Sequence, residues 1–329
     1  MKRAAGYIAK RILELIVSLV LLSFVIFSLL YIAPGDPARQ LVGTKKATPE
    51  LLARIRESYG LDDPFFVQYK RWIEGVLHFD FGKSIRTDQT VIEYVAPHAS
   101  VTLQLVVMAL VLSVIFGLML GIVAAKSRGT KRDNVINTLA LVGTSAPSFA
   151  VALLFLYVFA LKFGWFPIYG IGNGSFGDSL RHLALPSIVL TFGVSALIVK
   201  ITRSALLTED SKDYTTFMRA RAVLPARITF VQLKNVSAPV LTSTGLVLAN
   251  LVAGTILVES VFSIPGLGNL LASSVTFHDV PVVQFIALAL AFIVCASSAL
   301  VDILVFLIDP LSGKARSIHK ISTAGEKNR

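Results

Sequence analysis

The sequence DYTTFMRARAVLPARITFVQLKNVSAPV, residues 213–240, is basic and amphipathic and lies between two long apolar stretches. It is too polar to cross a bilayer, which requires about 20 predominantly apolar residues of helix, and too long and apolar for a simple turn. Its apolar spacing predicts a helix, a turn and a second helix over residues 213–233. Asp213 is expected to cap the first helix, and Pro225 to end it or begin the second. Such a loop needs a surface to contact.

Long apolar stretches occupy much of the rest of the chain. Of the 329 residues, 54% are hydrophobic and only 16% are charged, and the mean hydropathy is +0.72. This balance excludes an ordinary soluble domain. The sequence predicts an all-α integral membrane protein with six transmembrane helices, at residues 12–32, 101–125, 135–163, 183–199, 240–262 and 282–308. Gly143, Ser145 and Pro147 are expected to kink the third span and to let helices approach closely.

Lysine and arginine are unevenly distributed between the loops. Residues 1–11, 126–133, 200–240 and 312–329 carry four, four, seven and five of them, whereas the short loops 164–182 and 263–281 carry only Arg181. Because basic residues are enriched in short cytoplasmic loops, both termini and the 213–240 loop are predicted to be cytoplasmic. The net charge of +11 then indicates contact with anionic membrane lipid rather than with nucleic acid.

Residues 34–100 fall on the opposite side of the membrane and form a predicted helical cap between the first two spans. Long segments cross the membrane largely regardless of charge, and this one contains nine basic and nine acidic residues. Helices are expected at residues 48–59 and 64–77. Tyr69 and Trp72 lie on an aromatic stripe of the second helix. This stripe packs on the outer mouth formed by the membrane spans, docks an incoming protein, or does both.

The sequence offers little chemistry of its own. It has no glycine-rich phosphate loop and no HExxH zinc motif, and the single cysteine, Cys295, excludes a disulfide framework. We therefore expect no enzyme activity, no catalytic residue and no metal site. Glu14, Glu259 and Asp302 lie away from the centres of their spans, which argues against an ion-coupled carrier or a channel. A membrane scaffold would leave the long basic loop unexplained.

A series of motifs in a fixed order carries a resemblance. The loop combines Asp213, Arg219, Ala220 and Arg221 with Asn235 and Pro239. The other motifs are APGDP (33–37), GLDDPFFVQYKRW (60–72), DFGKSI (80–85), SVTLQL (100–105), HLALPSIVL (182–190), VESVFSIPGLGNLL (258–271), DVPVVQ (279–284), VD (301–302) and DP (309–310). Together they resemble the B-type inner-membrane permease of dipeptide/oligopeptide ABC importers, a type I permease family with a cytoplasmic coupling helix.

The resemblance implies a bacterial inner-membrane assembly. Its expected partners are a C-type permease subunit, two ATPase subunits that hold ATP and Mg²⁺, and an extracytoplasmic substrate-binding protein. This chain itself is expected to bind no cofactor. The coupling helix, between the fourth and fifth spans, would contact the ATPase through Asp213, Tyr214, Arg219, Ala220, Arg221 and Ala222. Tyr69 and Trp72 would help to dock the binding protein.

Domain boundaries follow from the same alignment of motifs. Residues 1–33 form the N-terminal tail and first span, 34–100 the cap, 101–311 the permease core with its coupling loop at 203–240, and 312–329 a cytoplasmic tail. In one respect the sequence departs from the family: the loop glycine is replaced by Ala222, so a different turn geometry is expected. The resemblance covers transporters of peptides, glutathione, nickel chelates and some oligosaccharides.

Overall fold

The computed structural model describes residues 2–32, 38–39, 48–59, 62–172 and 175–308, and this part of the chain is helical. It holds a single isolated bridge between Lys83 and Thr90 and no strand. The helices are α1 (Lys2–Ile32), α3 (Pro49–Tyr59), α4 (Phe65–Leu77), α5 (Val91–Lys126), α6 (Lys131–Ser145), α7 (Ser148–Phe155), the π-helix η1 (Leu156–Lys162), α8 (Phe176–Asp210), α9 (Asp213–Ala220), α10 (Pro225–Asn235), α11 (Ser237–Val261), α12 (Leu267–Thr276) and α13 (Val280–Ile308). The predicted tail at 312–329 lies outside the described residues.

Five helices are long and apolar enough to cross a membrane: Ala5–Ser28 within α1, then α5, α8, α11 and α13. Many of their side chains are more than half exposed, among them Leu13, Leu21 and Leu300. Because apolar surface on this scale is unfavourable in water, it indicates contact with lipid or with another membrane subunit. The all-α membrane fold predicted from the sequence is confirmed.

The third predicted span is the exception to the predicted geometry. Instead of one kinked helix over 135–163, α6 and the α7–η1 segment meet at a bend of 110°. The break falls at Ala146 and Pro147, where proline cannot continue the hydrogen-bond ladder. The predicted close approach is confirmed, since a Cβ on Gly143 would lie 2.6 Å from the carbonyl oxygen of Phe192 in α8.

Helices α5 and α8 form the centre of the packing. A Cβ on Gly117 would lie 2.6 Å from Ile198, and one on Gly121 would lie 2.7 Å from Thr202. These glycines allow the two backbones to approach as small residues do in membrane helix pairs. Helices α7 and α11 pack around this contact, and the four helices share one apolar core that includes Leu105 and Leu251.

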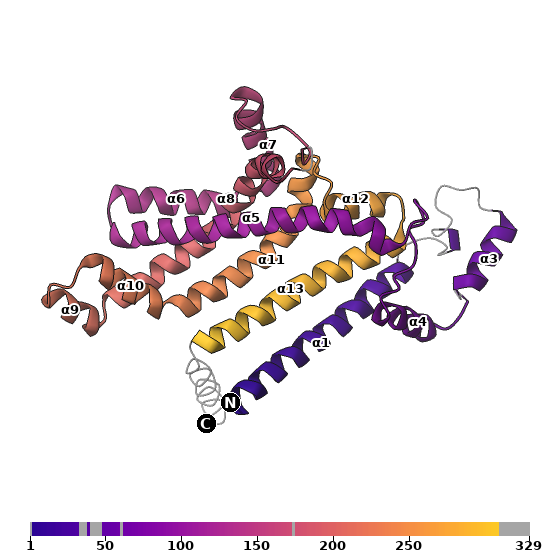
Figure 1. Ribbon diagram of the computed structural model, residues 1–329, viewed down its shortest axis with the longest axis horizontal. Helices are drawn as coiled ribbons and strands as arrows, with labels where there is room; N and C mark the ends of the chain where they lie inside the picture. The colour runs from indigo at the N-terminus through magenta and orange to yellow at the C-terminus, as the bar shows by residue number, and fades with distance from the viewer. Residues whose placement is uncertain (1, 33–37, 40–47, 60–61, 173–174, 309–329) are drawn as a thin grey trace.

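Figure 1 shows the long helices running side by side, with α9, α10 and the α5–α6 turn towards one end and α4 and α12 towards the other. The start of α1 lies at the same end as α9 and α10. Three of the four lysine- and arginine-rich segments of the sequence are therefore grouped at one end of the molecule. α1 packs on α13 and, at its opposite end, on α4.

Both cap helices begin close to where the sequence predicts. The hydroxyl of Thr48 accepts a hydrogen bond from the backbone amide of Leu51 at 3.3 Å, which caps α3. Pro64 immediately precedes α4. The cap does not end at residue 100 as a separate unit, because α5 already begins at Val91, so the predicted boundary falls inside this helix.

Candidate functional site at the basic loop

The basic loop, residues 211–236, has the predicted helix–turn–helix form, built by α9 and α10. Pro225 occupies the start of α10, where its fixed φ favours a helix. The expected cap by Asp213 is wrong: Asp213 is the first residue of α9, and the capping position belongs to Lys212, without a side-chain cap hydrogen bond. A carboxylate in the first helical turn still interacts favourably with the helix dipole.

Ala222 has a φ of +54°, a left-handed conformation that favours glycine. Its amide donates to the carbonyl of Arg219 at 2.9 Å, and the amide of Val223 donates to Met218 at 3.1 Å. The turn at the position of the missing glycine is therefore left-handed, and the expectation of a different turn geometry stays a prediction. Alanine adopts this left-handed conformation at a cost of about 1–2 kcal/mol.

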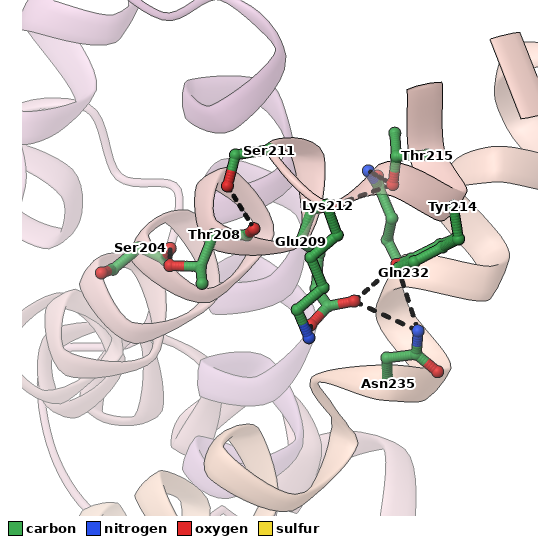
Figure 2. Close-up of polar contacts among 9 residues, drawn as sticks. All are labelled: Ser204, Thr208, Glu209, Ser211, Lys212, Tyr214, Thr215, Gln232 and Asn235. Carbon is green, nitrogen blue, oxygen red and sulfur yellow. Dashed lines mark hydrogen bonds and ion pairs between the residues drawn. The ribbon is translucent and has the colours of Figure 1, made fainter. Parts of the chain in front are cut away.

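A buried carboxylate at the end of α8 holds this loop in place. Glu209, only 6% exposed, accepts hydrogen bonds from the Tyr214 hydroxyl at 2.5 Å and the Asn235 side-chain amide at 3.1 Å, and it pairs with Lys212. The backbone carbonyl of Glu209 also accepts from the Thr215 hydroxyl at 2.8 Å. Figure 2 shows these side chains converging on Glu209 from both helices of the loop.

The neighbouring Asp210 makes a second connection. Its carboxylate pairs with Arg219 of α9 and accepts a hydrogen bond from Gln232 of α10 at 3.1 Å. The two adjacent acids therefore each contact both short helices. We call Glu209, Asp210, Gln232 and Asn235 the loop clamp, because together they fix α9 and α10 to the end of a long helix.

Contact with Glu209 raises the pKa of two side chains next to the clamp. Burial, with the hydrogen bond to Glu209, raises the pKa of the Tyr214 phenol, so this hydroxyl remains a donor at neutral pH. The hydrogen bond to Glu209 raises the pKa of the Lys212 ammonium. Both groups donate to Glu209 in their protonated forms.

The outer surface of the loop is apolar at several points. Phe217, Leu224 and Phe230 are 57%, 74% and 69% exposed, whereas the buried residue of α9 is Thr215. The guanidinium of Arg221 lies 4.4 Å from the centre of the Phe217 ring. The apolar residues of α9 and the turn after it therefore face outwards and do not pack on the chain itself. Exposed apolar surface of this kind is typical of an interaction surface.

Sequence reasoning assigned no role to the clamp. The structure brings the predicted Tyr214 and Arg219 to it, while Asp213, Ala220, Arg221 and Ala222 are exposed. Two adjacent acids end α8, and Gln232 and Asn235 stand three residues apart on α10. This is the one sequence signal that could have indicated the clamp. Asp133 and Arg203 form a further ion pair of 2.7 Å that fixes α6 to α8 nearby.

A second buried carboxylate, Glu259, lies near the opposite end of α11. It accepts hydrogen bonds from the Thr102 hydroxyl at 2.6 Å and from the backbone amides of Gly268 and Asn269 at 2.7 and 3.1 Å. These amides belong to the first turn of α12, where such groups otherwise have no helical partner. A Cβ on Gly266 would lie 2.3 Å from this carboxylate. The VESVFSIPGLG motif thus joins α5, α11 and α12.

The predicted docking residues of the cap contact α1 of the same chain. The Tyr69 hydroxyl lies 2.8 Å from the hydroxyl of Ser23, and the Trp72 ring lies 5.5 Å from that of Phe27. Both aromatics are partly buried. The neighbouring Phe66 is 72% exposed.

A further group of charged side chains joins α1 to α13. Arg11 contacts Glu14 at 2.6 Å and Asp302 at 3.2 Å, close to the start of α1. Among the described residues, no group of three or more histidine, cysteine or acidic side chains is arranged to hold a metal ion.

Comparison with known proteins identifies the class. Residues 117–313 match the family of binding-protein-dependent transport system inner membrane components, and residues 5–106 match the N-terminal family of such membrane components. The fold and the loop define a multi-pass helical membrane protein. The chain belongs to the binding-protein-dependent transport system inner membrane component family, as an ABC permease of the peptide importer type.

Several relatives match over almost their whole length. A glutathione transport system permease protein, GsiC, of Salmonella paratyphi A is 36% identical, over 93% of this chain and 98% of the relative. A probable peptide ABC transporter permease, y4tP, of Sinorhizobium fredii is 33% identical, over 92% and 98%. A putative peptide transport system permease, BAB2_1050, of Brucella abortus is 35% identical, over 92% and 97%.

A solved structure shares the fold. The inward-facing MetNI methionine ABC transporter aligns with a TM-score of 0.56 and 17% identity, over 65% of this chain and 95% of the matched chain.

Proposed function

We propose that this chain is the transmembrane permease subunit of an ATP-driven importer of short peptides, that it lines the translocation pathway, and that it is coupled to separate ATPase subunits. The observation that carries the proposal is the clamped loop. Its exposed apolar surface, with Arg221 beside it, is fixed to the long helix α8 by Glu209 and Asp210. A force applied to this surface is therefore transmitted to a membrane span.

The proposed partners are two ATPase subunits beneath the loop, a C-type permease beside this chain and a substrate-binding protein above it. ATP and Mg²⁺ belong to the ATPases, and this chain performs no catalysis. The loop and both termini face the cytoplasm, and the assembly lies in a bacterial inner membrane. The grouping of lysine- and arginine-rich segments at one end supports this orientation.

A peptide is the substrate class that the relatives favour. Two of the relatives above are named as peptide transport permeases and one as a glutathione transport permease. Glutathione is itself a tripeptide, so it belongs to the same class of small, charged, amide-containing solutes. Competition between labelled dipeptides, longer peptides and glutathione for uptake by the assembled importer distinguishes an importer of short peptides from an importer of glutathione.

Charge reversal on the loop tests the coupling. Arg219 and Arg221 are both exposed, so Arg219→Glu/Arg221→Glu is expected to leave membrane insertion intact and to separate ATP hydrolysis from uptake. The Arg219–Asp210 pair is solvent-exposed and contributes at most about 1 kcal/mol. Lys131→Glu/Arg132→Glu, at the exposed start of α6, is the matched control and should behave as wild type. Normal uptake by the loop variant would show that the loop lies on lipid instead.

A further inference from the structure

A cleft of about 650 Å³ opens between the α5–α6 turn, the end of α8 and the basic loop. Lys126, Arg128 and Arg219 contribute basic groups to it, and Leu206, Val223 and Ile228 contribute apolar walls. It is larger than a single phosphate requires and lies within the size range of small-molecule sites.

The charge of the cleft is unbalanced. Asp210 is its one acidic lining residue, and its carboxylate is already paired with Arg219 and Gln232. Within the described ranges, Lys126 and Arg128 have no ion pair or hydrogen bond from their side chains. Two unpaired cations therefore face a partly apolar hollow, which favours a ligand that has both an anionic and an apolar part.

The walls of the cleft are held in place. The bidentate Asp133–Arg203 pair, at 2.7 Å for both contacts, fixes the start of α6 to α8, and the amide of Gly129 donates to Asp133 at 3.1 Å. On the other side Asp210 and Gln232 fix α10 to α8. The cations of the turn and the apolar residues of the loop are thus presented to one another by rigid elements.

We propose that this cleft binds one anionic phospholipid, with the headgroup phosphate at Lys126 and Arg128 and the glycerol and first acyl carbons against Leu206, Val223 and Ile228. Its position supports a lipid source, because the cleft is lined by the last residues of α5 and α8, which are both candidate membrane spans. Polybasic segments next to membrane spans attract anionic lipid at this depth. The bound lipid would bridge the α5–α6 turn to the basic loop, an effect beyond the proposed transport function and independent of it.

Lipid retention tests the proposal directly. The full chain, purified in detergent, is incubated with phosphatidylglycerol and phosphatidylcholine of identical acyl chains, and the bound lipids are counted by native mass spectrometry. Wild type is expected to retain phosphatidylglycerol preferentially. Lys126→Gln/Arg128→Gln is expected to lower that preference by roughly tenfold or more, since each basic residue near anionic lipid contributes about fivefold.

Two further variants locate the site. Lys131→Gln/Arg132→Gln removes the same charge from exposed positions that do not line the cleft, and it is expected to retain the preference. Val223→Trp fills the apolar wall without changing charge and is expected to lose retention. Thermal unfolding without lipid checks that each variant is folded.

The contrary outcomes are equally specific. An equal loss of the phosphatidylglycerol preference in both double variants would show a general effect of surface charge. The proposed site would then be wrong. If folded Val223→Trp still retained phosphatidylglycerol, the lipid would have to bind outside the cleft. Inorganic phosphate could instead displace phosphatidylglycerol and raise the melting temperature by as much as the lipid does. The ligand would then be free phosphate, and the lipid assignment would be wrong.

Discussion

Glu209 is a single side chain on which both helices of the basic loop depend. It accepts from Tyr214 and Asn235 and pairs with Lys212. Glu209→Ala leaves these partners without their acceptor, and each hydrogen bond lost costs about 0.5–1.5 kcal/mol. We expect the assembled importer to hydrolyse ATP while peptide uptake falls by about tenfold or more, because the loop then moves without α8.

Comparing uptake and ATPase activity in the same proteoliposomes measures this separation. Glu209→Gln keeps one acceptor oxygen and should be intermediate, whereas Ser211→Ala, an exposed neighbour, should behave as wild type. If ATP hydrolysis and uptake were lost together, Glu209 would instead be required for assembly of the importer complex.

Ala222 carries the left-handed turn of the loop at φ +54°. Ala222→Gly removes the steric cost of this conformation, so the loop should be stabilised by about 1 kcal/mol, partly offset by the entropy of glycine. Slower limited proteolysis of the loop, with uptake unchanged, is the expected result. Ala226→Gly, in helix α10, should have the opposite effect. Faster cleavage of Ala222→Gly would show that alanine is not strained there.

α12 is a short helix whose position depends on Glu259. Removing this carboxylate by Glu259→Ala leaves the Thr102 hydroxyl and the amides of Gly268 and Asn269 without their acceptor. We expect a loss of at least about 2 kcal/mol in the free energy of unfolding. Gly266→Ala should be similarly harmful, because its Cβ would overlap the carboxylate.

Thermal unfolding in detergent provides the measurement. Gly177→Ala is the control, since a Cβ there meets nothing within 4 Å. A melting temperature of Glu259→Ala equal to that of wild type would mean that water or a rearranged α12 satisfies these donors.

The α4 helix separates two roles that the sequence left joined. Tyr69 and Trp72 contact Ser23 and Phe27 of α1, while Phe66 on the same helix is 72% exposed. Tyr69→Ala/Trp72→Ala should lower thermal stability and weaken stimulation of the ATPase by the binding protein. Phe66→Ala should leave stability unchanged, because it buries little. If the double variant loses stability alone, binding-protein docking lies on the outer loops 164–182 and 263–281.

Helices with a strong local signal could be predicted from sequence, and contacts between them could not. Apolar length located α5, α8, α11 and α13, and Thr48 marked the start of α3. The 110° bend at Pro147 was predicted only as a kink, because the bend angle depends on packing against α8 and α11. Glu209 and Glu259 acquired roles only when residues distant in sequence, such as Asn235 and Thr102, met them in space.

Considered as a whole, the molecule has two structurally different ends. One end groups three of the four basic segments and the clamped loop, and the other holds α4 and α12. The long helices between them carry no midplane cluster of ionisable residues within the described part of the chain. The proposed coupling to ATPase subunits places the energy input at the end with the clamped loop, where Phe217, Leu224 and Phe230 are exposed.

Peptide uptake into proteoliposomes tests this account most directly. The chain is reconstituted with its C-type partner and binding protein, either with or without the two ATPase subunits, and labelled dipeptide accumulation is measured with ATP present. The account predicts accumulation against a gradient only when the ATPases are included, and its loss in Glu209→Ala. Accumulation of peptide by the permeases without any ATPase would contradict it.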